Sequence, residues 1–523
     1  MDPITIYGIA AGGIALMAFL YTTSSHISRW IQDRTFFYVF KYLIYPIFIQ
    51  RNRLFTPFSR WRALLIMIYW SGTVACNLVG VATISQAGKR AGALAALHLV
   101  PLLFTNRPSF TADLLGISVQ SYLKMHSTLG LMTFLQSLIH IVIFLTRNTF
   151  RIGDPLQFYG FLGAVAIASL MLLSTLRIPL FEFFQKTHYA LAILTAYVIW
   201  RHLSIKPAVA RIYIIVAGSI FCLTTIARYS RLVVRNVVWR QLYATTKLVG
   251  VQDIVRVQVT PVRPWKIRAG QYVYIWMPGV SFGSPFQSHP FMISWWEHDI
   301  RGRGTNIYLL VKPASGFTRK LLRHAGTCDL KAWVDGPYGE LHDIGDYGSV
   351  VMFANGIGIA TQVPYIKELL NGFQEYKVRT KSILLVWQLD KESDEDWVQD
   401  WMTQLLSEDK GSYVLRIALY VLRNFNDEQI SYGRKEQYGD HERIKKLYGR
   451  PDLEKIIKSE IDAKRGRLVI TTSTECNMQA QIQRLAHKYL DKDVKLIHLA
   501  FQPQGYRGFW APKPPEVKYE GVV

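Results

Sequence analysis

The sequence lacks the cysteine patterns that mark a disulfide framework or a zinc site, because its four cysteines are scattered without motif spacing. They are Cys76, Cys222, Cys328 and Cys476. The first apolar run also lacks a basic region before it and a small-residue cleavage site after it. We therefore expect a retained membrane anchor there rather than a signal peptide.

Acidic residues are scarce as well, since 37 Asp and Glu stand against 60 Lys and Arg and leave a net charge of +23. A strongly basic chain can bind nucleic acid. Here, however, most basic residues before Lys247 lie in loops between apolar segments, which membrane topology explains better. We therefore expect membrane lipid, and no nucleic acid, among the partners of this chain.

Long apolar segments fill the chain up to about Arg228, in a sequence that is 50% hydrophobic and 13% aromatic. Seven of them approach the length of a membrane span, although the third and sixth are short for a full crossing. They are Ile4–Thr22, Trp61–Ile84, Ala91–Thr105, His126–Leu145, Leu156–Leu176, His188–Leu203 and Arg211–Ala227. This pattern predicts an integral, multi-pass membrane domain, followed after Arg228 by soluble domains.

The basic residues between these segments predict an orientation. The segments after the first and last spans hold Arg29, Arg34, Lys41, Arg51, Arg53 and Arg60, then Arg228, Arg231, Arg235 and Arg240. The loops that alternate with these, on the opposite side of the membrane, hold only Lys89, Arg90, Arg147, Arg151, Arg201, Lys206 and Arg211. The positive-inside rule then places everything after Arg228 in the cytosol, at the plasma membrane or an internal membrane.

Two of the predicted spans carry a histidine near each end. His126 and His140 lie fourteen residues apart, and so do His188 and His202. Fourteen residues of α-helix rise about 21 Å in almost four turns, so both histidines of a span share nearly one face. If the two helices are neighbours, His126 faces His188 at one membrane surface and His140 faces His202 at the other. Haem with two axial imidazoles is the group that fits such pairs.

A histidine in an apolar helix is usually hydrogen-bonded to a neighbour and nothing more, and His98 in the third span is interpreted in that way. Ionisable residues inside a membrane are costly, however, and tend to be functional. Because four histidines occur at two identical spacings, we favour haem ligation for those four.

From about Lys247, short β-rich runs separated by turns predict an antiparallel barrel, with strands over 251–259 and 269–277. Further along, strands alternate with helices, which predicts a parallel sheet with helices on its faces. The polar stretch 424–455 is interpreted as an exposed insertion and helix within this α/β domain.

A glycine-rich turn, Asn355-Gly-Ile-Gly-Ile-Ala, follows the first strand of the α/β domain. Gly356 and Gly358 would let backbone N–H groups approach a pyrophosphate at a helix N-terminus. Thr361 stands where the third glycine of a full dinucleotide motif would be, so a plain tight turn is an equally good interpretation.

These features, together with four short motifs, resemble one protein family. The motifs are Ala269-Gly270-Gln271-Tyr272-Val273, His289-Pro290-Phe291, Gly336-Pro337-Tyr338-Gly339 and Tyr448-Gly449-Arg450-Pro451. With the two histidine-bearing spans, they make the chain resemble the fungal ferric-chelate reductases, which are flavin- and haem-containing transmembrane reductases related to the NADPH oxidases. The resemblance runs from about Ala95 to Phe509.

The resemblance implies a multi-pass α-helical transmembrane haem domain followed by a cytosolic ferredoxin-reductase-like module. In that module an antiparallel β-barrel binds FAD and an α/β domain binds NADPH or NADH. The implied domains are N-terminal membrane helices with a basic cytosolic loop over 1–90, the haem domain over 91–228, the FAD-binding barrel over 245–345 and the nucleotide-binding domain over 346–515.

The resemblance also implies roles for individual residues. Two b-type haems would be ligated by His126, His140, His188 and His202. The FAD would be lined by His289, Pro290 and Phe291, with Ser294 nearby, and its phosphates would be covered by a segment that contains Lys312, Gly316 and Thr318. The nicotinamide dinucleotide would contact Gly336, Pro337, Tyr338, Gly339, Gly356, Gly358 and Cys476, the last of which follows the final predicted strand.

Three departures from the family pattern bear on activity. Met292 stands where a threonine would hydrogen-bond the flavin, and Asn477 and Met478 replace the Gly-Pro that follows the cysteine. An expected arginine is missing near Asp390, and an acidic residue there favours a free ribose hydroxyl, so NADPH and NADH both stay open. The alternative for Cys476 is a buried small hydrophobe, and for His289 an ordinary strand residue before a proline.

We therefore expect an oxidoreductase that moves electrons from cytosolic NAD(P)H through FAD and two haems to an acceptor across the membrane. A ferric iron chelate, as in iron transport, is the first expectation, because basic outer loops favour an anionic acceptor. A plainly solvated surface explains the same charges equally well. Three alternatives stay open: reduction of oxygen, reduction of an organic metabolite in a biosynthetic pathway, and a non-catalytic haem-binding membrane protein.

Overall fold

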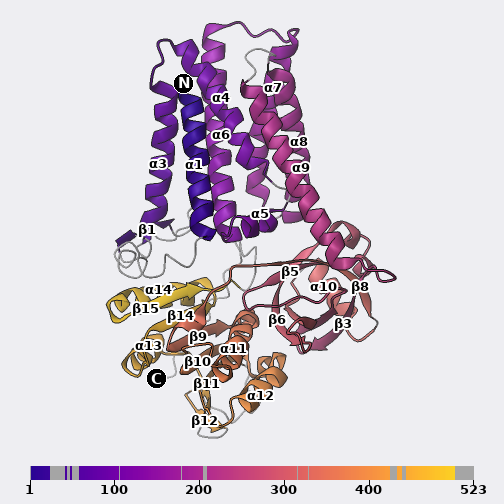
Figure 1. Cartoon of the computed structure of the whole chain (residues 1–523), viewed down its shortest axis with the longest axis vertical. Helices are drawn as coiled ribbons and strands as arrows, with labels where there is room; N and C mark the ends of the chain where they lie inside the picture. Colours follow the sequence, from indigo (N-terminus) through magenta and orange to yellow (C-terminus); the bar gives the residue numbers. More distant parts are fainter. Residues whose placement is uncertain are drawn as a thin grey trace, which may run out of the picture. The chain divides into compact units, whose positions relative to one another are not determined.

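The computed structural model contains two compact units, a helical one over Met1–Arg228 and a β-rich one over Tyr229–Gly505 (Figure 1). The structure describes residues 2–23, 42–43, 47–49, 58–104, 107–177, 180–203, 209–314, 316–327, 329–423, 433–438 and 443–500. Several predicted features lie outside these described residues: most of the basic loop over 29–53, Lys206, Cys328, and the end of the nucleotide-binding domain after residue 500.

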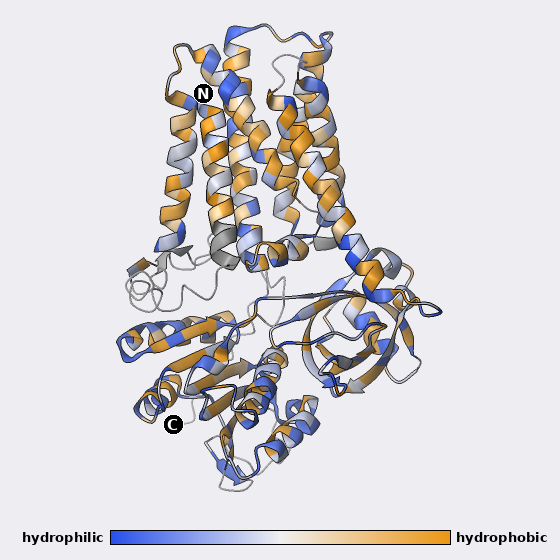
Figure 2. Cartoon of the chain, in the orientation of Figure 1, coloured by the Kyte–Doolittle hydropathy of each residue, from blue (hydrophilic) through white to orange (hydrophobic). Residues whose placement is uncertain are grey.

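A helix lies at each of the seven predicted membrane segments. These helices are α1 (Pro3–Thr23), α3 (Arg60–Leu78), α4 (Ile84–Leu102), α6 (Val119–Arg147), α7 (Pro155–Leu173), α8 (Phe181–His202) and α9 (Val209–Asn236). Among the described residues, three helical stretches are long and apolar enough to cross a membrane unaided: Val119–Arg147, Pro155–Arg177 and Val209–Asn236. Hydrophobic residues run along most of these helices in Figure 2. The chain is an integral membrane protein, as predicted.

The boundaries of the helices correct the predicted loops. Helix α3 ends at Leu78 rather than near residue 84, since Gly80 takes a φ of +67° that stops the helix. The Thr83 hydroxyl then accepts a hydrogen bond from Gln86 N and starts α4. Lys89 and Arg90 therefore lie inside α4 and not in a loop. The same holds for Arg147, Arg201, Arg211, Arg228, Arg231 and Arg235, which all lie within helices.

Small residues allow the membrane helices to approach closely. Helix α4 packs along α6, and α7 packs along α8. A side chain on Gly88 of α4 would place its Cβ 2.7 Å from Ile143 on α6, so only glycine permits this contact. Asn77 on α3 donates a buried hydrogen bond to Gln136 on α6, at 2.9 Å. Backbone proximity and one buried polar contact thus hold α3, α4 and α6 together.

The β-rich unit begins with a closed antiparallel barrel. Its strands in spatial order are β3 (Ala244–Val251), β4 (Ile254–Thr260), β7 (Gly304–Val311), β6 (His289–His298), β5 (Tyr272–Trp276) and β8 (Leu330–Tyr338). Helix α10 (Phe317–Arg323) follows β7 in the chain. The predicted strand over 251–259 is wrong at its start, because Gln252 and Asp253 form the turn between β3 and β4, with Gln252 at a φ of +51°.

A mainly parallel sheet of seven strands follows, in the order β12-β13-β11-β10-β9-β14-β15. The strands are β9 (Ser349–Asn355), β10 (Ser382–Lys391), β11 (Leu415–Arg423), β12 (Lys435–Tyr438), β13 (Ile444–Tyr448), β14 (Leu468–Ser473) and β15 (Val494–His498). The helices are α11 (Ile359–Gln374), α12 (Gln399–Glu408), α13 (Leu453–Asp462) and α14 (Cys476–Lys488). A helical membrane domain, an antiparallel barrel and an α/β domain thus occur in the predicted order.

The predicted insertion over 424–455 is partly wrong, because β12 and β13 belong to the sheet and β13 pairs in parallel with β11. Residues 424–432 and 439–442 lie outside the described residues. The polar composition of β13 does not indicate a buried strand. The strand can be buried because the charge of Lys446 is neutralised by Glu392 at 2.6 Å and Glu395 at 3.0 Å. The edge strand β15 was also not predicted.

The buried carboxylate of Asp409 offers a test of this fold. It accepts hydrogen bonds from Val414 N at 3.0 Å, Leu415 N at 2.9 Å and Arg443 Nη1 at 2.8 Å. Asp409→Ala removes the carboxylate that neutralises the buried Arg443 and is expected to cost about 3–5 kcal/mol of stability. Thermal unfolding of the purified protein checks this against Glu375→Ala, which removes a fully exposed ion pair and should change the midpoint little. Equal shifts in the two variants would contradict the account.

Candidate functional site

Helices α6 and α8 bring the four predicted histidines together in two pairs. The ring centroids of His126 and His188 lie 6.1 Å apart, and those of His140 and His202 lie 6.3 Å apart. Each pair joins the two helices at one level, because fourteen residues separate the histidines on both helices. These are the pairs expected from the spacing.

The distance within each pair matches a metal held between two imidazoles. A metal–nitrogen bond of about 2 Å, with each ring centroid about 1 Å beyond its nitrogen, separates the centroids by about 6 Å. A direct hydrogen bond between the rings, at about 2.9 Å from nitrogen to nitrogen, would bring them to about 5 Å. Among the described residues, no group of three or more His, Cys, Asp or Glu could hold a metal ion. The spacing of 6.1 and 6.3 Å fits haem iron, which takes two protein ligands.

The rings of His140 and His202 are oriented by the backbone. His140 Nδ1 lies 2.8 Å from Gly88 O, and His202 Nδ1 lies 2.7 Å from Leu156 O. A carbonyl oxygen can only accept, so each Nδ1 carries the proton and each Nε2 keeps a free lone pair. Metal-binding histidines commonly donate their second nitrogen in this way, which sets the ring orientation.

Two glycines make room for these rings and were missed in the sequence analysis. A Cβ on Gly92 of α4 would lie 2.9 Å from His140 Nδ1, and a Cβ on Gly160 of α7 would lie 2.7 Å from His202 Nδ1. Both distances are shorter than real Cβ contacts. The only sequence signal was a glycine inside an apolar helix, which does not by itself name its neighbour.

The rings of His126 and His188 are held by aromatic neighbours instead. The His126 ring stacks beside Tyr122, with centroids 6.4 Å apart, and the His188 ring lies 5.1 Å from Phe184. Within the described part of the chain, the buried Nδ1 of His188 has no hydrogen-bond partner. His98, by contrast, donates from Nδ1 to Leu94 O at 2.6 Å and is paired with no other histidine among the described residues. Its predicted structural role agrees with this contact.

The predicted flavin residues come together from β6 and α10. The His289 ring stacks on Phe317, with centroids 4.1 Å apart and planes 18° apart. Gly316, with a φ of +62°, leads into α10, and the Thr318 hydroxyl accepts a hydrogen bond from Ala314 N at 3.0 Å. His289 thus joins the two segments that the resemblance assigns to FAD, and its predicted role at the flavin stays a prediction.

The other predicted flavin residues are less open to a ligand. Ser294 is completely buried, and its hydroxyl donates to Met292 O at 3.4 Å. Phe291 packs partly against the barrel core. The Lys312 ammonium lies 3.9 Å from Asp253 and 5.3 Å from the ring centroid of Trp397, so a phosphate would compete with these contacts.

The motif Gly336–Gly339 serves close backbone packing in this structure. A Cβ on Gly339 would lie 2.3 Å from Gly270 O, and both glycines have positive φ, at +135° and +84°. Tyr338 is buried and donates to Asp335 at 2.5 Å, while Pro337 O accepts from Arg231 at 2.5 Å. These contacts explain the motif without a ligand, and its predicted role at the nicotinamide stays a prediction.

The carboxyl ends of β9 and β14 form the candidate dinucleotide site. At Gly358 in the turn after β9, a Cβ would lie 1.9 Å from Ser473 O, so the two strand ends touch there. In this part of the described chain, four buried polar atoms have no hydrogen-bond partner: Asn355 Nδ2, Thr361 Oγ1, Ser473 Oγ and Thr474 Oγ1. In open α/β sheets, ligands bind at the carboxyl ends of the strands, at the point where the strand order reverses. We call this region, at the carboxyl ends of β9 and β14, the dinucleotide edge. The unsatisfied atoms fit a polar ligand such as a dinucleotide.

Cys476 lies beside this edge as the first residue of α14 and is exposed. The alternative that it is a buried small hydrophobe is therefore wrong. The polar residues at the ends of β9 and β14 were not recognised from the sequence, because Asn, Thr and Ser after a strand are equally typical of ordinary turns.

Three family models match successive parts of the chain. "Ferric reductase like transmembrane component" matches residues 91–199, "FAD-binding domain" matches residues 238–342, and "Ferric reductase NAD binding domain" matches residues 347–473. His126, His140 and His188 fall within the first match, and His202 lies just beyond its end.

Curated relatives carry the same kind of description. The ferric/cupric reductase transmembrane component 2 of Saccharomyces cerevisiae is 26% identical over 297 residues, which cover 54% of this chain and 40% of that protein. A probable cell surface ferric reductase of Aspergillus oryzae is 25% identical over 345 residues, or 60% and 44% of the two chains. The chain thus spans less than half the length of these relatives. A solved Amycolatopsis cytochrome P450 reductase is 16% identical, with a TM-score of 0.34, over 50% of this chain and 72% of its own.

The stacked His289 predicts a pH dependence of stability. Burial lowers the pKa of His289 to about 4, from an ordinary value of 6.5. Between these two pH values His289 is protonated in the unfolded chain and neutral in the folded chain. The free energy of unfolding therefore falls as the pH drops from 6.5 to 4. His289→Gln should reduce the loss of thermal midpoint between pH 7 and pH 5, measured on the purified protein. An identical loss in both proteins would contradict this assignment.

Proposed function

Because the chain belongs to the fungal ferric-chelate reductase family, we propose that it is a transmembrane oxidoreductase that uses NAD(P)H, FAD and two b-type haems to reduce a ferric iron chelate. The observation that carries this proposal is the spacing of the two histidine pairs, at 6.1 and 6.3 Å between ring centroids. The FAD-binding and NAD-binding matches supply the source of electrons in the same chain.

Each group of residues has a defined task in this proposal. When bound, FAD would exchange hydride for single electrons, and the haems would carry those electrons singly. The pairs His126–His188 and His140–His202 would supply axial ligands about 21 Å apart along α6 and α8. Gly88 O and Leu156 O keep the outer imidazoles in the tautomer that can ligate iron. His289, stacked on Phe317, would line the flavin, and the carboxyl ends of β9 and β14 would bind NAD(P)H.

The charge on the side opposite the C-terminal unit bears on which electron acceptor is reduced. The positive-inside rule would place the C-terminal unit in the cytosol and the acceptor on the opposite side of the membrane. Of the basic residues on that side, Lys89, Arg147, Arg151 and Arg201 are exposed. Arg211 is already bound to Leu203 O at 2.7 Å. The exposed cations favour an anionic acceptor such as a ferric chelate over neutral oxygen or an uncharged organic metabolite.

The proposal is tested by the colour of the haems. Without oxygen, NAD(P)H should convert the haem absorption bands of the purified protein to their reduced form, and a ferric chelate should reoxidise them faster than oxygen does. Haems that stay oxidised would favour a non-catalytic haem-binding protein. Faster reoxidation by oxygen would favour an oxidase.

The ligand assignment is tested by a matched pair of histidine variants. His140→Ala should lose one of two haems and keep flavin, because the outer iron loses an axial ligand. His98→Ala removes a histidine of the same membrane unit whose contact is a backbone carbonyl, and it should keep both haems. Two haems retained in His140→Ala, or one lost in His98→Ala, would contradict the assignment.

The dinucleotide edge is tested by a matched pair of threonine variants. The buried Thr361 hydroxyl has no partner among the described residues, so Thr361→Val should raise the thermal midpoint slightly yet raise KM for NAD(P)H roughly tenfold. Thr471→Val breaks the 2.9 Å hydrogen bond to Gln362 and should cost about 1–3 kcal/mol of stability without that specific effect on KM. A lower midpoint and unchanged KM in Thr361→Val would show that the hydroxyl is structural.

A further inference from the structure

Four side chains from the barrel and the α/β domain form a continuous series of contacts, which we call the four-residue stack. The Arg256 guanidinium of β4 lies 4.4 Å from the ring centroid of Trp401 on α12. The Trp401 ring stacks on Trp295 of β6, with centroids 5.6 Å apart and planes only 3° apart. The Lys367 ammonium of α11 lies 3.8 Å from the Trp295 centroid. Barrel and α/β residues therefore alternate along the stack.

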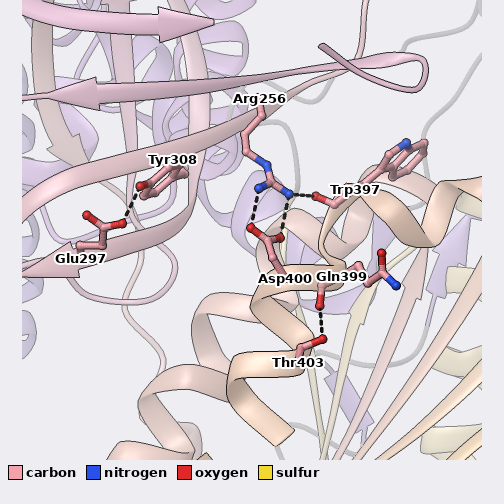
Figure 3. A network of polar contacts seen from close by, with 7 residues as sticks. All are labelled: Arg256, Glu297, Tyr308, Trp397, Gln399, Asp400 and Thr403. Atoms are coloured by element: carbon pink, nitrogen blue, oxygen red, sulfur yellow. Dashed lines mark hydrogen bonds and ion pairs between the residues drawn. The ribbon is translucent and has the colours of Figure 1, made fainter. Parts of the chain in front are cut away.

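Each cation of the stack is also tied to the opposite domain. Figure 3 shows Arg256 holding Asp400 with two hydrogen bonds, at 2.7 and 3.0 Å, and donating a third to Trp397 O at 2.7 Å. At the other end, Lys367 donates to Trp296 O of the barrel at 2.6 Å. The barrel cation thus binds the α/β domain, and the α/β cation binds the barrel.

The stack is almost closed to water, which strengthens its electrostatic contacts. Trp295, Trp401 and Lys367 are each at most 4% exposed. Burial lowers the pKa of Lys367 to about 8, so its ammonium stays charged at neutral pH. Cations over desolvated aromatic rings interact more strongly than exposed ones. The Tyr308 hydroxyl donates to Glu297 at 2.6 Å (Figure 3). The Tyr308 ring lies edge-on to Trp401, with centroids 5.9 Å apart.

The elements that carry the stack are the ones that carry the predicted cofactor residues. Strand β6 begins with His289, Pro290 and Phe291 and reaches Trp295 in the same strand. Helix α11 begins directly after Gly358 of the glycine-rich turn and carries Lys367. A contact between Trp295 and Lys367 therefore fixes the flavin strand relative to the helix at the dinucleotide turn.

From this arrangement we propose that Arg256, Trp295, Lys367 and Trp401 are positioning residues that hold the FAD-binding barrel and the NAD(P)H-binding domain at the separation needed for hydride transfer. This inference rests on the proposed function. In that reaction one hydride, two electrons with one proton, leaves NAD(P)H and is taken up by oxidised flavin. The four residues need not touch either reactant, because they act through β6 and α11.

Single-turnover reduction of the flavin by NAD(P)H, followed without oxygen, tests the proposal in the full-length protein. Arg256→Gln should slow flavin reduction at saturating NAD(P)H by about 10- to 100-fold, the size of effect that a misplacement near 1 Å produces. The NAD(P)H concentration for half-maximal rate should stay within about threefold, since the dinucleotide edge is untouched. Flavin and haem content should equal those of the wild type.

Four further variants separate positioning from general damage. Arg303→Gln removes a barrel arginine whose partner, Asp299 at 2.9 Å, lies in the same barrel loop, and it should leave the rate unchanged. Lys367→Met keeps the length of the side chain but removes the charge, and it should slow flavin reduction as Arg256→Gln does. Trp401→Phe keeps an aromatic face for both neighbours and should retain more of the rate than Trp401→Leu.

Wild-type rates in flavin-loaded Arg256→Gln and Lys367→Met would overturn the proposal, as would a loss of rate that only follows a loss of bound flavin. If Arg256→Gln does not fold, the same comparison of Lys367→Met with Arg303→Gln decides the matter. A wild-type protein whose flavin is not reduced by NAD(P)H would instead overturn the proposed function, and this inference with it. The two failures are therefore distinguishable.

Discussion

The imidazoles of His140 and His202 each need a hydrogen-bond acceptor inside the membrane unit, and this need organises their end of the helices. Each Nδ1 of this pair donates a hydrogen bond to a backbone carbonyl of a neighbouring helix, Gly88 O or Leu156 O. The two rings lie 6.3 Å apart between centroids, a separation suited to a metal between them. The close approach of α4 to α6 and of α7 to α8 follows from the same need, because Gly92 and Gly160 leave space for the rings.

The buried polar groups of the β-rich unit differ in whether the described residues satisfy them. Away from the candidate sites, charges are paired inside the protein, as Asp409 is with Arg443 and Lys446 is with Glu392. At the ends of β9 and β14 the polar atoms of Thr361 and Ser473 have no partner among the described residues. Buried polar groups without partners are costly in a folded chain. Their concentration at one sheet edge is the physical reason to place a ligand there.

The sequence predicts this architecture where local geometry decides the outcome. Fourteen-residue spacing sets the level of His126 and His140 on a helix, and the strand-helix alternation after residue 346 predicts the parallel sheet. Contacts between distant segments are not predictable in this way. Gly92 looks like any helical glycine until His140 is placed beside it, and the polar composition of β13 hides a strand because its charge is neutralised by Glu392. The roles of the flavin residues were available only through the family resemblance, whereas haem ligation followed from the histidine spacing.

The central claim is that two pairs of histidines hold two haems with imidazole on both sides of each iron. Electron paramagnetic resonance of the oxidised, purified protein, combined with haem and protein assays, tests it most directly. The account predicts two haems for each chain, both low-spin as two nitrogen ligands require, with no high-spin signal. One haem or none for each chain, or a high-spin signal from an iron with an open axial position, would contradict it.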